Sequence, residues 1–260
     1  MRVGLLKRAV GVIAILLSVL LMSAVPLFAQ GEAPLIITLN GDLWNWSGDP
    51  NVPPVALTTW GFNDPPALSP DGTRAAYSSV AQVVVTTIQQ VGAVGGGALP
   101  SNIWVIDIAS GDGFRAADQP PDAIFMDPAQ GTRGIVRSDP VWSPNGAQLA
   151  WGELAIPEMS GSVIVYDVGG GARAIAAGLP LSAGVPNPPD VQWGQSGIFV
   201  RSDELSADGR LVTRMTVYSP EGSQLASFAL GDGARAPSFY APMDANGREW
   251  LGVLFNDGVW

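Results

Sequence analysis

The sequence predicts an all-β fold, and three observations support that prediction. Gly occurs 32 times and Pro 22 times in 260 residues, and together they interrupt the chain every few positions, which breaks helices. Short runs rich in β-branched and aromatic residues lie between these breaks. We find no convincing amphipathic helix beyond residue 30 and expect none. The predicted strands include LIITL 35–39, IWVIDI 103–108, VIVYDV 163–168, IFV 198–200, MTVY 215–218 and WLGVLF 250–255.

The first 29 residues have the layout of a secretory signal peptide. A basic start precedes an apolar run over 9–25, and Ala29 supplies a small residue before the expected cleavage point. The run of about 17 residues is short for a bilayer, which needs roughly 20. Cleavage is therefore favoured over an uncleaved membrane anchor, and without Cys there is no attachment point for a lipid. We expect residues 30–260 to be exported and to be secreted, periplasmic or held at the cell surface.

The predicted exported part is strongly acidic. All 23 acidic residues follow residue 29, where ten of the 13 basic residues remain, so the net charge of 30–260 is −13. An acidic chain without a basic stripe argues against nucleic acid and anionic membranes as partners. We interpret the charge as a solubility feature. The three basic residues of the signal segment are Arg2, Lys7 and Arg8.

The composition excludes several classes of chemistry. The chain contains no His and no Cys, which excludes Ser-His-Asp and Cys-His catalysis, imidazole acid–base chemistry and His-ligated zinc or haem. No Gly-x-Ser-x-Gly nucleophile elbow occurs either. We therefore expect no catalytic residues, no cofactor and no metal site. An exported chain without Cys must also rely on its core instead of disulfides.

A repeated unit organises the predicted strands. PVWSPNGAQLAW at 140–151 aligns with PALSPDGTRAAY at 66–77, so that Pro140 falls on Pro66 and Trp151 on Tyr77. A fainter copy is VQWGQSGIFV at 191–200, and we expect a fourth within SFYAPMDANGREWLGVL at 238–254. The copies indicate a hairpin that recurs along the chain.

A second signature follows each hairpin. NIWVIDIASG at 102–111 matches SVIVYDVGGG at 162–171, and each is an aliphatic strand that ends in Asp and a Gly turn. The unit measures about 50 residues once two insertions near 80–100 and 120–136 are set aside. Repeats of that length with about four strands each predict propeller blades. We expect the segment 80–100 to be a Gly-rich loop or an extended hairpin.

The repeated turn requires its residue types. Pro144 presets φ at the second turn position, Asn145 can bond back to the turn backbone, and Gly146 supplies a left-handed position. Because the turn fixes the register of two strands, we assign its residues a structural role. The turn residues of the two best copies are Ser69, Pro70, Asp71, Gly72, Ser143, Pro144, Asn145 and Gly146.

Other recurring residues also have a structural interpretation. Asp107 and Asp167 recur in the second signature, and we expect them to serve turns or inter-strand hydrogen bonds. The Asp-Gly segments at 47–51, 110–113 and 244–247 are interpreted as turns instead of metal sites. The aromatic residues that we expect to pack between adjacent blades, in preference to stacking on a ligand, are Trp104, Trp142, Trp151 and Trp193.

The two hairpin copies and the strands that follow them resemble the WD-like propeller repeats of TolB-type periplasmic proteins, over roughly residues 35–260. The resemblance implies a bacterial β-propeller of the envelope or the exterior that usually binds other proteins. Related blades also form the N-terminal half of prolyl-oligopeptidase-type peptidases. The resemblance therefore leaves two expectations open, a binding protein and part of a hydrolase.

The number of blades is also open. NGDLW at 40–44 resembles NDGVW at 256–260, and 216 residues separate Trp44 from Trp260, which is about four repeats of 54. Either the chain closes a small propeller of about four four-stranded antiparallel blades, or it is part of a larger one. The second alternative is favoured, because the chain ends on an apolar residue within a predicted strand.

We expect an exported, non-catalytic propeller that acts as a scaffold for a protein, a peptide or another ligand. The partner would bind where loops of different blades converge, and the insertions at 80–100 and 120–136 are the first candidates for contact. Two alternatives are the regulatory propeller of a prolyl-oligopeptidase-like hydrolase whose catalytic part is absent, and a lectin-like propeller that binds glycans.

Overall fold

The computed structural model describes residues 35–92, 99–179, 187–205, 207–209, 211–232, 238–240 and 252–254. Residues 35–260 form one compact unit by their contacts. The predicted signal peptide, the Asp-Gly turn at 244–247 and the segment 256–260 lie outside the described residues, as does most of the predicted fourth copy.

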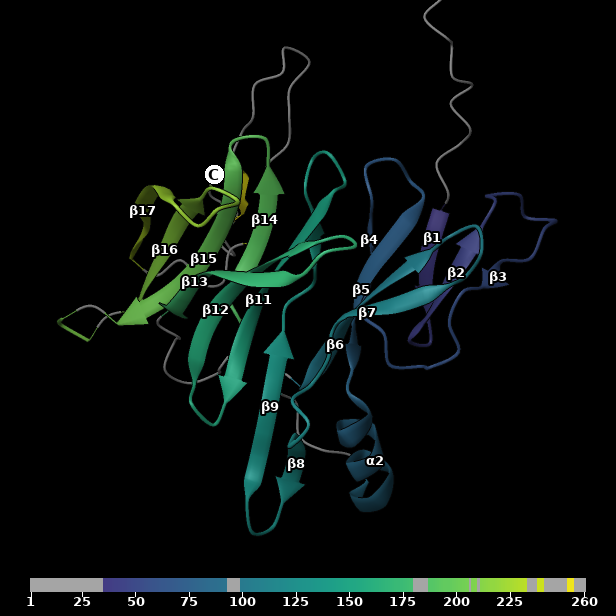
Figure 1. Ribbon diagram of the computed structural model, residues 1–260, viewed down its shortest axis with the longest axis horizontal. Helices are drawn as coiled ribbons and strands as arrows, with labels where there is room; N and C mark the ends of the chain where they lie inside the picture. The colour runs from purple at the N-terminus through teal and green to yellow at the C-terminus, as the bar shows by residue number, and fades with distance from the viewer. Residues whose placement is uncertain are drawn as a thin grey trace, which may run out of the picture. The chain divides into compact units, whose positions relative to one another are not determined.

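Successive antiparallel sheets build the fold, which confirms the all-β prediction (Figure 1). The second and fourth sheets have the four strands expected of a propeller blade, in chain order. The first sheet contains β1 (Leu35–Leu39), β2 (Asp42–Trp46) and β3 (Val55–Ala56), and the second contains β4 (Ala67–Leu68), β5 (Arg74–Val80), β6 (Ser101–Asp107) and β7 (Gly113–Ala117). The third contains β8 (Ile124–Asp127), β9 (Gly131–Arg137), β10 (Val141–Trp142), β11 (Gln148–Ile156), β12 (Ser160–Asp167) and β13 (Ala172–Leu179). The fourth contains β14 (Asp190–Gly194), β15 (Gly197–Leu205), β16 (Leu211–Tyr218) and β17 (Gln224–Asp232), and β18 (Ser238–Tyr240) pairs with β19 (Gly252–Leu254).

Neighbouring residues of one strand pack against different sheets. In β5, Ala75 and Tyr77 share a buried cluster with Leu43 of the first sheet. Ala76, which lies between them, belongs to a cluster with Trp142 of the third sheet. Successive side chains of a strand point to opposite faces, so this alternation means that both faces of the second sheet are covered.

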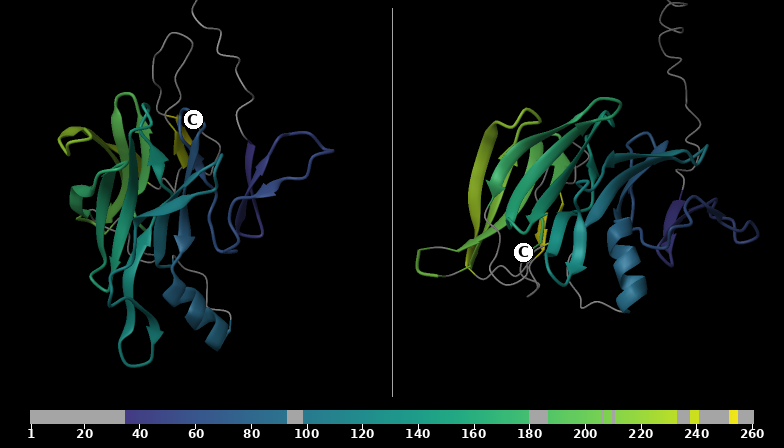
Figure 2. Two further views of the ribbon diagram at one scale, coloured as in Figure 1. Left: turned by 45° about the vertical axis from the view of Figure 1, so that its right-hand side comes forward. Right: turned by 60° about the horizontal axis from the view of Figure 1, so that its bottom comes forward.

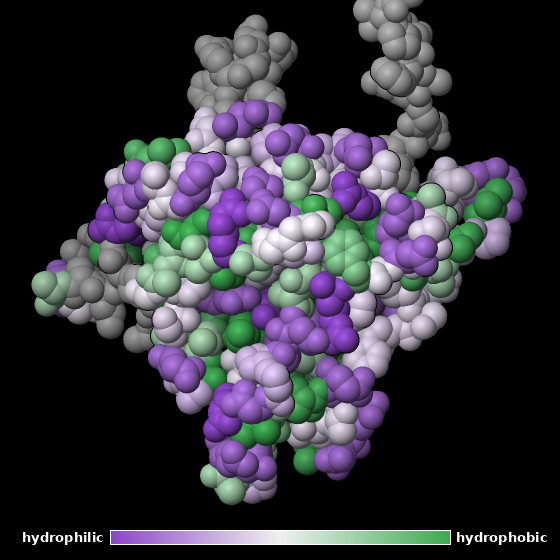
Figure 3. Space-filling view, viewed as in Figure 1, coloured by the Kyte–Doolittle hydropathy of each residue, from purple (hydrophilic) through white to green (hydrophobic). Residues whose placement is uncertain are grey.

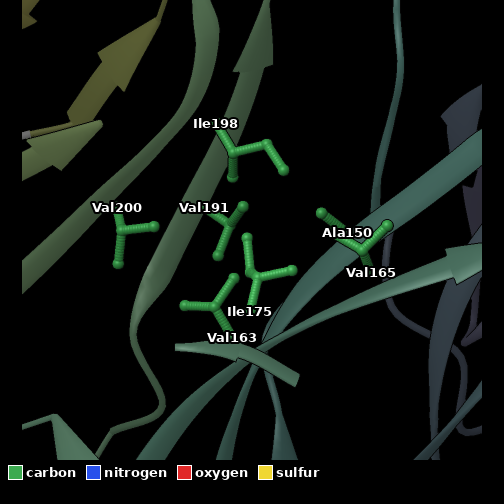
Figure 4. Packing of buried hydrophobic residues seen from close by; sticks show 7 residues of the cluster. All are labelled: Ala150, Val163, Val165, Ile175, Val191, Ile198 and Val200. Atoms are coloured by element: carbon green, nitrogen blue, oxygen red, sulfur yellow. The ribbon is translucent and has the colours of Figure 1, made fainter. Parts of the chain in front are cut away.

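The third sheet repeats this pattern. Leu149 and Trp151 of β11 pack toward the second sheet, whereas Ala150 packs toward the fourth. Figure 4 shows the core between the third and fourth sheets, which contains Ala150 together with aliphatic side chains that include Val191 and Ile198 of the fourth sheet. Face-to-face packing of consecutive sheets is the arrangement expected of propeller blades.

The two best copies of the repeat form the same turn. The backbone N–H of Ser143 donates to the carbonyl oxygen of Gln148 at 2.9 Å, and the Ser143 hydroxyl accepts the Gln148 N–H at 2.9 Å. Asn145 accepts the Ser143 hydroxyl at 2.8 Å, and Gly146 adopts a φ of +70°. Corresponding bonds and the same φ recur within 69–74.

Residues 82–91 correct one expectation from the sequence. They form helix α2 (Gln82–Val91), so the expected loop or hairpin over this part of 80–100, and the expected absence of helix, are wrong. The β-branched side chains lower helix propensity, but Val84 and Val85 are buried, and burial of an apolar stripe outweighs a small propensity cost. Among the described residues, no helix is long and apolar enough to cross a membrane.

The segment 120–136 also differs from a simple inserted loop. It contains β8 and most of β9, and the C-terminal part of β9 pairs with β11 from Gly134 opposite Ile156 to Arg137 opposite Glu153. The strand β10 pairs with β11 further along. Residues 134–137 therefore belong to the third sheet, and β9 and β10 pair with β11 on either side of an interruption at 138–140.

Candidate functional site

Two segments outside the repeat come together on one side of the second and third sheets. Helix α2 and the β8–β9 hairpin lie side by side (Figures 1 and 2), and the Thr87 hydroxyl lies 3.4 Å from the carbonyl oxygen of Phe125. Arg133 forms a 3.0 Å ion pair with Asp122 at the base of the hairpin. We call α2 and the β8–β9 hairpin together the projection.

The projection has a weakly charged surface on an acidic chain. Helix α2 contains no charged residue, and the exposed side chains include Val91 and Met126, at 63% and 52% exposure. On the face in Figure 3, apolar residues occur in small groups between polar ones, on the projection as well as elsewhere. Depletion of charge and enrichment of Met are typical of protein interfaces.

A cavity of about 450 Å³ lies between the second sheet and residues 58–63, which connect the first sheet to the second. We call it the inter-sheet cavity. Indole rings, amides and hydroxyl groups dominate its lining, and Arg115 is the one charged residue that lines it within the described part of the chain. The lining includes Trp60, Tyr77, Asn102, Trp104 and Arg115.

The aromatic side chains of the cavity are held in place. The Trp60 indole N–H donates to the carbonyl oxygen of Val80 at 3.3 Å. The Arg115 guanidinium lies over the Trp104 ring, 5.4 Å from its centroid, and also pairs with Asp118. These contacts fix two indoles in the lining before any ligand binds.

Two polar groups define what the cavity can do. Asn102 is 8% exposed, and its Oδ1 atom is buried without a hydrogen-bond partner. Burial, followed by the charge of Asp42, raises the pKa of Tyr77 to about 12, so its phenol remains protonated at neutral pH. Among the residues that the structure describes, the lining therefore offers an acceptor and a neutral hydroxyl group, and no base.

The predicted packing residues have different surroundings. Trp142 and Trp151 lie in the core between the second and third sheets, and the Trp142 indole N–H donates to the carbonyl oxygen of Ala67 at 2.9 Å. Trp193 is partly buried against the core between the third and fourth sheets. Trp104 packs against the core of the first and second sheets, and it also lines the cavity.

The recurring aspartates take part in hydrogen bonds of the sheets. Asp107 accepts the backbone N–H groups of Ala109 and Ser110 at 3.0 and 2.8 Å, within the turn after β6. Asp167 accepts hydrogen bonds from Gln148 and Arg173, and these bonds lower its pKa, the Gln148 bond most. Neither carboxylate lines the inter-sheet cavity.

Sequence reasoning missed three aspartates at or just before the starts of strands β4, β10 and β14, which belong to successive sheets. Asp64 precedes β4, Asp139 precedes β10, and Asp190 begins β14. Those strands lie against one another, β10 touching both others. The Asp139 side chain reaches solvent, but the surrounding protein removes part of its hydration. This burial, together with the charges of Asp64 and Asp190, raises the pKa of Asp139 to about 6.

A sequence signal for these aspartates existed. Asp-Pro occurs at 64–65 and again at 139–140, a few residues before each of the two best hairpin turns. In the part of the chain that the structure describes, no group of three or more acidic side chains is placed to hold a metal ion. The effect of the three aspartates is therefore electrostatic: Asp64 and Asp190 contribute to the raised pKa of Asp139.

No protein-family model and no curated protein matches the chain. Among solved structures, a TolB candidate from Agrobacterium tumefaciens matches at 16% identity and a TM-score of 0.43, over 85% of each chain. TolB from Acinetobacter baumannii matches at 14% identity and a TM-score of 0.35, over 86% of this chain and 61% of that one. A candidate dipeptidyl aminopeptidase IV from Bacteroides ovatus matches at 14% and 0.40, over 81% and 34%.

These similarities assign neither a family nor an activity. The fold is assigned from the order and pairing of the strands. The resemblance of the repeats to those of TolB-type proteins remains a prediction from the sequence.

Proposed function

We propose that the chain is an exported, non-catalytic propeller scaffold that binds a partner protein or peptide through the projection. The observation that carries this proposal is that two segments outside the repeat meet in one surface. Each segment could have formed a separate loop. Insertions in repeat folds are common places for binding, because the repeat itself does not need them for its packing.

The composition of the projection supports a protein partner. An uncharged helix with exposed apolar residues is unusual on a chain with a net charge of −10. A protein or peptide can cover Val91 and Met126 and remove their apolar surface from water.

The chemistry of the chain supports a role without catalysis. The sequence has neither His nor Cys, and Tyr77, which lines the inter-sheet cavity, remains a neutral phenol. The signal-peptide layout of the first 29 residues supports export.

Charge substitution on the projection tests the proposal. The double variant Val91→Lys, Met126→Lys places two cations in the expected contact while leaving the buried side chains of α2 unchanged. We expect at least roughly a ten-fold loss of partner capture, because charges are costly at the core of an interface. The measurement is affinity capture from bacterial envelope extracts with residues 30–260 as bait, followed by titration of the captured protein.

Leu225→Lys is the matched control. Leu225 is 56% exposed, comparable to Met126, and lies on β17 of the fourth sheet. Thermal melts establish that all variants are folded. Equal capture by the double variant and the control would rule out the projection as the binding surface, and capture of no specific protein by the unmodified chain would overturn the proposed function itself.

A further inference from the structure

The inter-sheet cavity has the dimensions of a site for a small ligand. Its volume of about 450 Å³ falls within the range of roughly 300–1,000 Å³ that such sites occupy. Indole rings provide apolar surface, and amide and hydroxyl groups provide convergent polar atoms. This combination, an apolar lining with a few placed polar groups, is typical of binding pockets.

The Asn102 side chain indicates what the ligand must offer. A buried polar atom without a partner costs free energy, and native folds rarely keep one. Asn102 lines the cavity, and its Oδ1 atom is buried and unpartnered. The atom is a hydrogen-bond acceptor that the surrounding protein covers. A donor in the cavity, such as a hydroxyl group, would satisfy it once the Asn102 side chain turns Oδ1 toward the ligand.

The indoles indicate a second property. Trp60 is 36% exposed, and its N–H group is already bonded to the Val80 carbonyl oxygen, so its remaining surface in the cavity is apolar. Trp104 is held from one side by Arg115. A ligand that satisfies both Asn102 and Trp60 has hydroxyl groups on its edge and C–H groups on a face.

The charge of the lining indicates a neutral ligand. Among the described residues, no carboxylate lines the cavity, so a cationic ligand would find no ion-pair partner there. The single cation, Arg115, is already neutralised by Asp118 and lies against Trp104. An anionic ligand would have to compete with that ion pair.

We propose that the inter-sheet cavity binds a neutral sugar ring, a hexopyranose. A ring hydroxyl donates to Asn102 Oδ1, and the C–H face of the ring packs on Trp60. The cavity touches the projection only at Gln82, the first residue of α2, and the proposal does not depend on Val91 or Met126. The sugar can be a free monosaccharide or the end of a longer glycan, since both present the same ring.

The test uses residues 30–260 and the methyl glycosides of glucose, galactose, mannose and N-acetylglucosamine. Saturation-transfer NMR detects contact of the ring protons, and calorimetric titration gives the affinity. We expect at least one glycoside to bind with a Kd below about 10 mM, the range of a weak single-ring site. Tetrasaccharides ending in that sugar distinguish the two sources: an equal Kd indicates a site for one ring, and a tighter Kd indicates a longer glycan.

Asn102→Leu is the decisive variant. It removes the unpartnered oxygen, so the free protein should melt at the same temperature as the unmodified chain or higher, while the affinity for the sugar falls at least roughly ten-fold. Trp60→Ala should weaken binding to a similar extent. Phe114→Ala is the control, because Phe114 is 40% exposed on β7 and does not line the cavity.

Three results would overturn the proposal. No glycoside of the panel binds; a glycoside binds Asn102→Leu and Trp60→Ala as tightly as it binds the unmodified chain; or a crystal soaked with the glycosides contains only an ordered water molecule on Asn102. Partner capture through the projection should be unchanged in Asn102→Leu, so failure of the sugar site leaves the proposed scaffold function standing.

Discussion

Single residues of the repeat connect one sheet to the next. Trp142 fills the core between the second and third sheets, and its indole N–H bonds to Ala67, 75 positions earlier in the chain. The place of Trp142 in the repeated hairpin was visible in the sequence, but its hydrogen-bond partner was not. A backbone carbonyl carries no residue-specific signal, so the sequence predicted the packing of this side chain and could not predict its bond.

The charge on Asp139 should reduce stability at neutral pH. Its pKa is about 6 in the folded protein, above the value of about 3.9 for an unfolded chain. Between these values the folded chain holds a proton that the unfolded chain has lost, so stability falls as the pH rises from about 4 to 6. Asp139→Asn removes the penalty.

We expect Asp139→Asn to be more stable than the unmodified chain at pH 7.5 by up to about 1 kcal/mol, because solvent screens the exposed carboxylate. This corresponds to a rise in Tm of roughly 2–4 °C. At pH 4 the two proteins should melt together. Asp112→Asn, at an exposed aspartate in the turn after β6, serves as the control. An identical gain at both pH values would contradict this account.

Strands were easier to predict than the helix. The apolar, β-branched runs in β6 and β12 were clear, since each strand is covered on both faces and bounded by turn residues. Helix α2 has three consecutive Val residues and two Thr residues, a composition that favours strands. Only burial of Val84 and Val85 makes the helix favourable, and that burial depends on tertiary contacts that a local pattern does not contain.

The close approach of the third and fourth sheets gives a prediction at the element scale. A Cβ atom at Gly152 of β11 would lie 2.0 Å from the carbonyl oxygen of Pro189. Gly152→Ala should therefore force the sheets apart and destabilise the protein by about 2–3 kcal/mol. Thermal unfolding should show a fall in Tm of roughly 5–10 °C.

Gly171→Ala provides the control. A Cβ atom at Gly171 would meet nothing within 4 Å, and neither glycine has a left-handed φ. We expect this variant to change stability by no more than about 0.5 kcal/mol. A Gly152→Ala protein as stable as the Gly171→Ala protein would contradict the packing of β11 against the segment before β14.

At the scale of the whole molecule, the antiparallel sheets could be predicted from the sequence, whereas the inter-sheet cavity and the joined projection could not. The repeat predicted the sheets and their order. The inter-sheet cavity joins residues from four separate segments, and its residues Trp60, Tyr77 and Asn102 have no recognisable motif. The projection was expected as two contact segments near 80–100 and 120–136, but their association follows from the fold. Both surfaces depend on which sheets become neighbours.

Hydrogen–deuterium exchange tests the central claim, that the projection is the binding surface of a scaffold, most directly. The mature chain is measured alone and with its captured partner. We predict slower exchange in α2 and in β8–β9, because a bound partner shields these backbone amides, and unchanged exchange in β16 and β17. Protection confined to the fourth sheet, with α2 and β8–β9 exchanging as in the free protein, would contradict the account.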